Sequence, residues 1–329
     1  MRILVTGGAG YIGSVVTEQL LCAGHTAVVY DDLSTGHADE AEPGAAFVRA
    51  DLFDDTALRD TLRRHRIETV MHFAGASIVS ESVADPMKYY RQNVVGGLGL
   101  LAAMRATGVG ALVFSSSAAV YGDPAKTLID EEQPTVPINP YGETKLAFER
   151  VLGWHAAAWG LRAVSLRYFN AAGASTKHGE RHAPETHLVP LVLEAAAGQR
   201  PHVTIYGDDY PTRDGTCVRD YVHVEDIASA HVLALAALGH GPGHVAYNLG
   251  TGEGATVREV VDAAARVTGR QIPVVVGQRR SGDPAILVAG SARIERELGW
   301  RPRPSALETI VESAWRRMNS FGSPTWLPV

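Results

Sequence analysis

The chain has little cysteine: only Cys22 and Cys217 occur among its 329 residues. They lie far apart and form no Cys-x-x-Cys arrangement, which argues against a disulfide framework and against a thiolate metal site. Such sparse use of cysteine is typical of the reducing cytoplasm, where we expect this protein. Cys22 falls inside an apolar helical pattern and is predicted to belong to the core.

Long apolar runs and excess positive charge are also missing. No apolar run approaches the roughly 20 residues that span a bilayer, and the glycines from Gly7 onward interrupt the first apolar run too soon for a signal peptide. The formal net charge of −6 and the pI near 6.1 give no general attraction to nucleic acid or to anionic membranes. We therefore expect a globular protein with neither of these partners, large enough for two domains.

Glycine is concentrated near the start of the chain, in the spacing Gly7-x-x-Gly10-x-x-Gly13. It separates the apolar run 3–6 from a helical pattern over 12–21, as expected for a buried parallel strand followed by a helix. Glycines here permit a tight turn and a close approach of the backbone, so that the helix N-terminus can receive a pyrophosphate. The pattern predicts a dinucleotide site.

An acidic residue follows at the distance that this kind of site requires. The apolar run 27–30 ends at Asp31, about 20 residues after the loop, where a carboxylate can accept hydrogen bonds from the adenosine ribose hydroxyls. The same carboxylate would repel a 2′-phosphate, so NAD is preferred over NADP. Asp32 is the alternative for this role.

Strand and helix patterns continue to alternate, which predicts a parallel, doubly wound sheet of the Rossmann type. The carboxyl ends of such strands bind ligands, so 51–52 and 73–75 are candidate adenine and ribose contacts. His72 is interpreted as a structural strand histidine. The expected elements are strands over 46–48, 69–73 and 111–114 and helices over 56–64 and 85–107.

The stretch Tyr141-x-x-x-Lys145 places a phenol and an ammonium on one helix face. Asn139 and Pro140 are suited to start that helix, by capping it and by occupying its first position. Half ionisation of a tyrosine at pH 7 needs a shift of about 3 pKa units, or roughly 4 kcal/mol. One cation at about 4 Å supplies a similar amount at an effective dielectric near 20. Ser117 ends a strand upstream and can relay a proton to Tyr141.

These motifs resemble the extended short-chain dehydrogenase/reductase family. The resemblance is carried by GGAGYIGS at 7–14, SSSAAVYG at 115–122 and YGETK at 141–145. Within the family, HFAG at 72–75, RYFN at 167–170 and VRDYVHV at 218–224 are similar to the branch that epimerises UDP-galactose, and the likeness extends to RSGD at 280–283.

The resemblance implies reversible C4 epimerisation of UDP-galactose and UDP-glucose through a transient 4-keto sugar, with tightly bound NAD. It implies that Tyr141, Lys145 and Ser117 are catalytic. The expected cofactor contacts are Gly7, Gly10, Tyr11, Ile12, Gly13, Asp31, Ser34, Thr35, Asp51, Leu52, Phe73, Ala74, Gly75, Asn93, Ser115, Tyr141, Lys145 and Tyr168. The expected substrate contacts are Ser117, Tyr141, Phe169, Asn170, His187, Leu188, Thr204, Tyr206, Arg219, Tyr221, Arg280 and Asp283.

We expect residues 1–168 to form the NAD-binding domain and residues 169–329 a smaller α/β domain for the nucleotide sugar, with segments around 222–250 rejoining the first. The polar stretch 170–186 is interpreted as a binding loop. His178, His182 and His187 fit no closed metal-ligand spacing, so no metal is expected. The second half is predicted to contain a strand over 203–207, a helix over 225–238, a strand over 245–249, and helix and loop from Thr256 onward.

Some features leave the substrate open. Ser77 stands where the family often has lysine, and Leu287 is of intermediate size where one side chain is thought to gate the sugar 2-substituent. UDP-N-acetylhexosamines and UDP-uronic acids therefore remain alternatives, whereas the neutral Ala118 and Ala119 argue against a dehydratase, which needs an acidic pair there. A non-catalytic NAD-binding regulator would be expected to lose Tyr141 or Lys145. The resemblance favours a homodimer, and the apolar helices over 94–104 and 146–159 could pair across its interface.

Overall fold

A computed structural model describes residues 1–124, 126–241, 243–280, 283–303 and 306–320. Ser281 and Gly282, in the motif predicted at 280–283, lie outside the described residues, as does 321–329 of the expected second domain. The central element is a parallel sheet of seven strands in the order β12-β7-β5-β4-β1-β2-β3. Their bounds are β1 (Arg2–Thr6), β2 (Thr26–Asp31), β3 (Ala46–Arg49), β4 (Thr69–His72), β5 (Ala111–Ser117), β7 (Arg162–Tyr168) and β12 (Gly243–Leu249).

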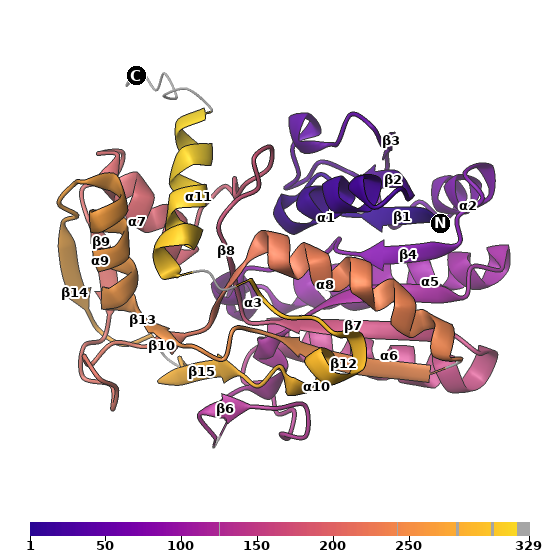
Figure 1. Cartoon of the computed structure of the whole chain (residues 1–329). Helices are drawn as coiled ribbons and strands as arrows, with labels where there is room; N and C mark the ends of the chain where they lie inside the picture. Colours follow the sequence, from indigo (N-terminus) through magenta and orange to yellow (C-terminus); the bar gives the residue numbers. More distant parts are fainter. Residues whose placement is uncertain (125, 242, 281–282, 304–305, 321–329) are drawn as a thin grey trace.

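Helices cover both faces of this sheet (Figure 1), because successive strand residues point to opposite sides. Ile3 and Val5 pack into the core under α1 (Tyr11–Cys22) and α8 (Val224–Ala237). Leu4 joins the opposite core with α2 (Asp55–Arg64), α5 (Gly96–Thr107) and α6 (Pro140–Trp159). The predicted doubly wound sheet is confirmed, and β12, from late in the chain, pairs with β7 at its edge.

The segment predicted as one helix over 85–107 is more varied than expected. It is preceded by α3 (Val79–Ala84) and divided into α4 (Pro86–Tyr89), a π-helical segment η2 (Tyr90–Val95) and α5. A π-helical turn shifts the side chains that follow it relative to an α-helix and is frequent at functional sites. It turns the buried Asn93 toward the end of β4, where it forms hydrogen bonds described below.

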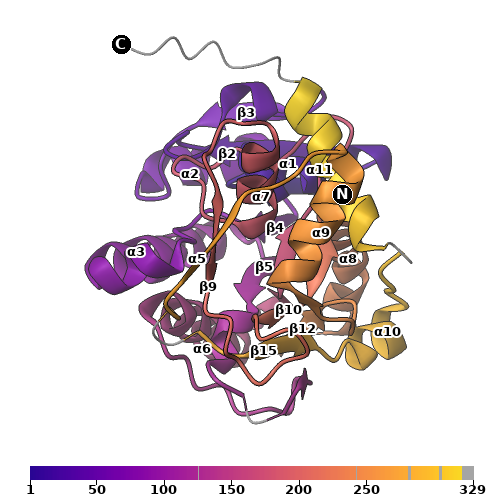
Figure 2. The same cartoon turned by 90° about the vertical axis from the view of Figure 1, so that its left-hand side faces the viewer.

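The second part of the chain has its own core, built on α7 (Leu188–Ala196), α9 (Val257–Thr268) and α11 (Leu307–Ser320). Helices α9 and α11 lie side by side in Figures 1 and 2, away from the large sheet. Short strands complete this part of the chain. In two pairs, β8 (Asn170–Ala172) lies next to β11 (Tyr221–His223), and β9 (Val203–Tyr206) lies next to β14 (Val274–Gly277). A sheet of four strands has the order β13 (Ala255–Thr256), β10 (Val218–Arg219), β15 (Ile286–Ala289) and β6 (Leu128–Ile129). The shorter helical elements of the chain are η1 (Ala38–Glu40), η3 (Ala118–Tyr121), η4 (Leu238–His240) and α10 (Ala292–Leu298).

Two expectations from the sequence were wrong. The stretch after Thr256 is not only helix and loop, because β14 and β15 pair with strands far away in the sequence. A strand of four residues has too little local pattern to be separated from an extended loop. Cys22 is exposed rather than part of the core, because it lies in the last turn of α1, just beyond the buried Leu20. None of the helices in the described ranges combines the length and the apolar character that a membrane span requires.

Candidate active site

Helix α6 begins as predicted and delivers the tyrosine to the end of β5. The Asn139 side chain accepts a hydrogen bond from the Gly142 N–H at 2.9 Å, and Pro140 occupies the first turn. A Cβ atom on Gly142 would lie 2.3 Å from the Ala119 carbonyl oxygen, so only glycine allows this close contact with η3. The close approach sets Tyr141 beside the serines that end β5.

The three residues predicted to be catalytic come together. Ser117 forms a hydrogen bond with the Tyr141 phenol, and Lys145 lies one helical turn further along α6. The Lys145 ammonium donates to the Ser115 carbonyl oxygen at 2.9 Å and lies 5.8 Å from the centre of the Tyr141 ring. A proton can therefore pass between a bound hydroxyl and Tyr141, directly or through Ser117.

The electrostatics of these side chains differ from the expectation. Burial raises the pKa of Tyr141, and the hydrogen bond with Ser117 offsets only part of this effect. Burial also lowers the pKa of Lys145 to about 8, against the opposing attraction of Glu149. The prediction that Lys145 alone brings Tyr141 near half ionisation at pH 7 is thus wrong, because desolvation outweighs a cation that lies beyond direct contact.

The glycine loop forms a cradle that larger residues would fill. Gly7 has φ +72, and a Cβ on it would lie 2.6 Å from the Ala74 nitrogen. A Cβ on Gly13 would lie 2.2 Å from the Gly7 carbonyl oxygen. Gly10 caps α1 without a side-chain hydrogen bond, so the first N–H groups of the helix are directed toward the loop. This arrangement fits the pyrophosphate of a dinucleotide.

Asp31 is buried beside this loop and organises it. Its carboxylate accepts hydrogen bonds from the N–H groups of Ala9 at 3.0 Å and Leu33 at 2.9 Å, and burial raises its pKa. Its competitor Asp32 is exposed and accepts from the Ser34 N–H at 2.8 Å. Asp31 is therefore the better placed of the two for the ribose.

The remaining predicted cofactor contacts surround the same end of the sheet. Ser34, Thr35 and Asp51 are exposed in the connections after β2 and β3, and Leu52 is partly buried. Ile12 packs against the core, whereas the Tyr11 hydroxyl donates to the Gly173 carbonyl oxygen at 2.6 Å. The Phe73 ring lies 4.7 Å from that of His231, which also contacts the Tyr168 hydroxyl at 3.0 Å.

Asn93, a predicted cofactor contact, forms hydrogen bonds with two neighbouring segments of the protein. Its Oδ1 accepts from the Ala76 N–H at 2.8 Å, and its Nδ2 donates to the Ala76 carbonyl oxygen and to the Thr144 hydroxyl. A Cβ on Gly75 would lie 2.7 Å from Asn93 Oδ1. Asn93 thus ties the end of β4 to the helix that carries Tyr141.

Three of the predicted substrate contacts, Arg280, Asp283 and His187, line two cavities. Arg219 pairs with Asp283, and the Arg280 guanidinium lies 3.9 Å from the centre of the Tyr206 ring, which follows Thr204 on β9. Arg280 and Asp283 line a cavity of about 310 Å³ together with Asp123, Ile138, Tyr210, Arg279 and Pro284. His187, just before Leu188 opens α7, lines a larger cavity of about 650 Å³ that Tyr11 also borders.

The other substrate candidates lie at the ends of β7 and β11. Asn170 begins β8, where its N–H donates to the Asp220 carbonyl oxygen at 2.9 Å, and its side chain is half-buried. Tyr221 is buried on the neighbouring β11. Phe169 and Leu287 each pack against the cluster that contains Tyr121.

A model of the NAD dependent epimerase/dehydratase family matches residues 3–250. The chain belongs to this family. It is 49% identical over 317 residues to the UDP-glucose 4-epimerase of Lacticaseibacillus casei, with 96% of each chain covered. A solved UDP-glucose 4-epimerase of Brucella ovis in complex with NAD superposes with a TM-score of 0.93 at 47% identity, covering 96% of this chain and 98% of that one. The Bifidobacterium longum enzyme with NAD+ and UDP gives a TM-score of 0.91 at 37% identity, covering 98% and 100%.

In this epimerase/dehydratase family member, sequence reasoning missed a buried network behind the active site. Glu149 accepts hydrogen bonds from Arg167 at 3.0 and 2.6 Å and from the Ser116 hydroxyl at 2.5 Å. Arg167 also donates to the Tyr121 hydroxyl, which in turn donates to Asn248 Oδ1. The sequence spacing could have indicated a role for Glu149, because Glu149 lies four residues after Lys145 and therefore shares its helix face.

Proposed function

We propose that this chain interconverts UDP-galactose and UDP-glucose by epimerising C4 of the hexose, with NAD as a resident cofactor. The observation that carries the proposal is the group formed by Tyr141, Ser117 and Lys145 at the carboxyl end of β5. The relatives named above support the choice of nucleotide sugar and cofactor.

The proposed proton chemistry belongs to Tyr141 and Ser117. Tyr141 removes the proton of the sugar 4-hydroxyl, directly or through Ser117, and later returns it. Bound NAD would supply the hydride acceptor and donor for C4 of the sugar, together with a positive charge that favours ionised Tyr141. Lys145 adds to this field as long as its ammonium remains charged, which the nearby carboxylate of Glu149 favours.

Release and reorientation of the sugar require a fixed anchor. Arg219, which pairs with Asp283, and Arg280, which lies over the Tyr206 ring, supply guanidinium groups, and such groups bind diphosphate oxygens well. Asp283 already holds the Arg219 side chain, so the diphosphate meets a pre-positioned cation. Holding the nucleotide in this way lets the 4-keto sugar turn over while its reacting carbon stays near Tyr141.

Incubation of the purified protein with UDP-galactose, without added reductant, tests the proposal. Formation of UDP-glucose that keeps a deuterium label placed at C4 is the expected result, because the hydride leaves and returns within one active site. A 6-deoxy-4-keto product would instead indicate a dehydratase, and no product would favour a non-catalytic NAD-binding protein.

UDP-N-acetylhexosamines are the second candidate substrates. Leu287, which packs against the cluster that contains Tyr121, has a side chain of intermediate size at the position expected to gate the sugar 2-substituent. Comparison of kcat/KM for UDP-galactose and UDP-N-acetylgalactosamine decides between the two. A ratio near one would extend the proposed function to both sugars.

We also propose a homodimer in the cytoplasm. Trp154 on α6 is 75% exposed, and Val95 and Leu98 beside α5 are 52% and 41% exposed, as expected for apolar side chains at an interface. The two free cysteines support a reducing compartment. Light scattering after gel filtration is expected to give twice the chain mass, and Trp154→Glu is expected to give monomers. A monomeric wild-type protein would overturn the dimer without affecting the proposed reaction.

A further inference from the structure

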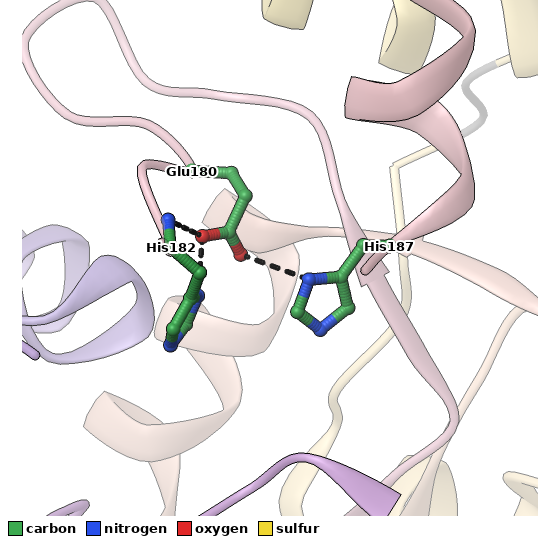
Figure 3. A group of neighbouring side chains, drawn as sticks. All are labelled: Glu180, His182 and His187. Carbon is green, nitrogen blue, oxygen red and sulfur yellow. Dashed lines mark hydrogen bonds and ion pairs between the residues drawn. The ribbon is translucent and has the colours of Figure 1, made fainter. Parts of the chain in front are cut away.

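The loop between β8 and α7 brings together side chains that the sequence did not connect. Glu180 lies between His182 and His187, and one ligand atom from each of the three residues lies within 4.8 Å of the other two (Figure 3). The Nδ1 atoms of both histidines face carboxylates: His182 contacts Glu180, and His187 lies 3.7 Å from Glu180 Oε2 and 2.8 Å from Glu185 Oε1. We propose that these three residues form a binding site for one divalent cation, with Zn²⁺ as the best fit and with Glu185, beside His187, moving in as a fourth ligand.

The ligand types and the spacing support zinc. Two imidazoles and two carboxylates are a normal four-coordinate set, and adjacent ligand atoms around tetrahedral zinc are about 3.4 Å apart. The separation of 3.7 Å between Glu180 and His187 is already close to this value. The contact of 2.8 Å between Glu185 and His187 is shorter because a proton now joins the pair, and it would need to open by less than about 1 Å.

The backbone holds both carboxylates in position. Glu180 Oε1 accepts from the N–H groups of Arg181 and His182 at 2.8 and 2.9 Å. Glu185 Oε1 accepts from the N–H groups of Thr186 and His187 at 2.7 Å each. Two carboxylates beside two neutral imidazoles carry a charge of −2, which one divalent cation would balance. The negative charge of the two carboxylates also acts on Tyr11. Burial is the main cause that raises the pKa of Tyr11, and Glu180 and Glu185 raise it further.

The ligands are accessible from the larger cavity. Glu180, His182, Glu185 and His187 all line the cavity of about 650 Å³ that also borders Tyr11 and Gly173. A cation held by His187 Nδ1 would fix the start of α7 and leave Nε2 for the predicted substrate contact. The loop between β8 and α7 would then be held in place by the metal.

A second group of possible ligands, Glu18, Glu42 and His178, is a weaker candidate. Lys177 already places its ammonium 3.0 Å from Glu42 and 3.6 Å from Glu18. Both ring nitrogens of His178 contact carboxylates, with Glu40 at 2.7 Å and Glu42 at 2.9 Å. The protein thus provides its own cations at this second group.

The test uses the full chain after treatment with a chelator, with zinc chloride as the only ligand, and so does not depend on the proposed function. Calorimetry at pH 7.5 is expected to show one Zn²⁺ per chain, and Co²⁺ is expected to give the visible absorption of a four-coordinate site. His182→Ala and Glu180→Gln should each weaken binding by at least about tenfold and reduce the Co²⁺ signal. His202→Ala is the matched control, from the segment before β9, and should bind as the wild type does.

Binding is also expected to weaken at acidic pH, because imidazole ligands must lose their proton to bind a metal. Circular dichroism without metal checks that each variant is folded. The proposal is overturned if the wild type binds no Zn²⁺, if His182→Ala binds as tightly as His202→Ala, or if binding is lost in His178→Ala and kept in His182→Ala.

Discussion

Two charged regions of the molecule compensate their charges in different ways. Behind the active site, Arg167 and Glu149 are 7% and 3% exposed and pair through two hydrogen bonds, so one positive charge meets one negative charge. In the segment 177–187, by contrast, His178 lies between Glu40 and Glu42, and further histidines face Glu180 and Glu185. The first region balances its charges within one buried pair, whereas the second combines carboxylates with histidines, whose charge depends on pH.

This difference indicates what each region can do. A buried and fully bonded ion pair resists rearrangement, because removing either partner leaves an uncompensated charge. Such a pair suits the wall behind a tyrosine and a lysine that must keep their positions. Histidines beside carboxylates change their charge near neutral pH, and their contribution to stability changes with it.

The largest effect is expected from the residue that carries the proton. Tyr141→Phe should reduce turnover of UDP-galactose by about 10² to 10⁴-fold, the usual contribution of acid–base catalysis, while the variant still binds NAD. Tyr89→Phe is the matched control, because its ring lies 6.4 Å from that of Tyr141 and its hydroxyl contacts Ile78 and Glu81 instead. Nearly normal turnover by Tyr141→Phe would contradict the assignment.

Removing the charge of Glu149 tests whether the balanced region also supports catalysis. Attraction by Glu149 raises the pKa of Lys145, so Glu149→Gln should lower that pKa further below about 8. A change of one unit would reduce the ammonium form about tenfold above its pKa and move the basic limb of the kcat profile to lower pH. Glu149→Asp should restore the profile in part. Loss of stability with an unchanged pH profile would leave Glu149 only a structural role.

Asn93→Ala should have a smaller effect on turnover, because this residue acts through its neighbours. The substitution leaves the polar groups of Ala76 and Thr144 without their hydrogen-bond partner. If water does not reach these groups, the folded state loses about 1–3 kcal/mol of stability. We expect kcat to fall by about tenfold with KM for UDP-galactose nearly constant, as measured in initial-rate assays. A rise in KM alone would instead indicate a direct role in substrate binding.

The smallest effect on turnover is expected from His178→Ala, whose consequence is a pH-dependent loss of stability. The folded protein raises the pKa of His178, so its stabilisation is complete below about pH 6.5 and is lost as pH rises through the raised value. Glu40 and Glu42 have lowered pKa values, so their share is lost only as pH falls through those values. Thermal unfolding should therefore show a larger difference from the wild type at pH 6 than at pH 9. An equal difference between variant and wild type at pH 6 and at pH 9 would contradict this pH dependence.

The sequence by itself determined the elements whose signals are local. Asn139 and Pro140 predict the start of α6 because capping involves residues three positions apart, and the apolar runs around Gly7 predict a strand, a turn and a helix for the same reason. The alternation of such elements was sufficient to predict the doubly wound sheet, since parallel strands with crossover helices have few other arrangements.

Only the tertiary structure decided the features that depend on distant partners. The pairing of β9 with β14, the bond from Glu149 to Arg167 and the contact of His178 with Glu40 join segments whose local patterns contain no reference to one another. The same holds for the pKa of Tyr141, which is raised because the packed fold removes water from the phenol. Burial is a property of the whole fold, and the residues of a five-residue motif cannot specify it.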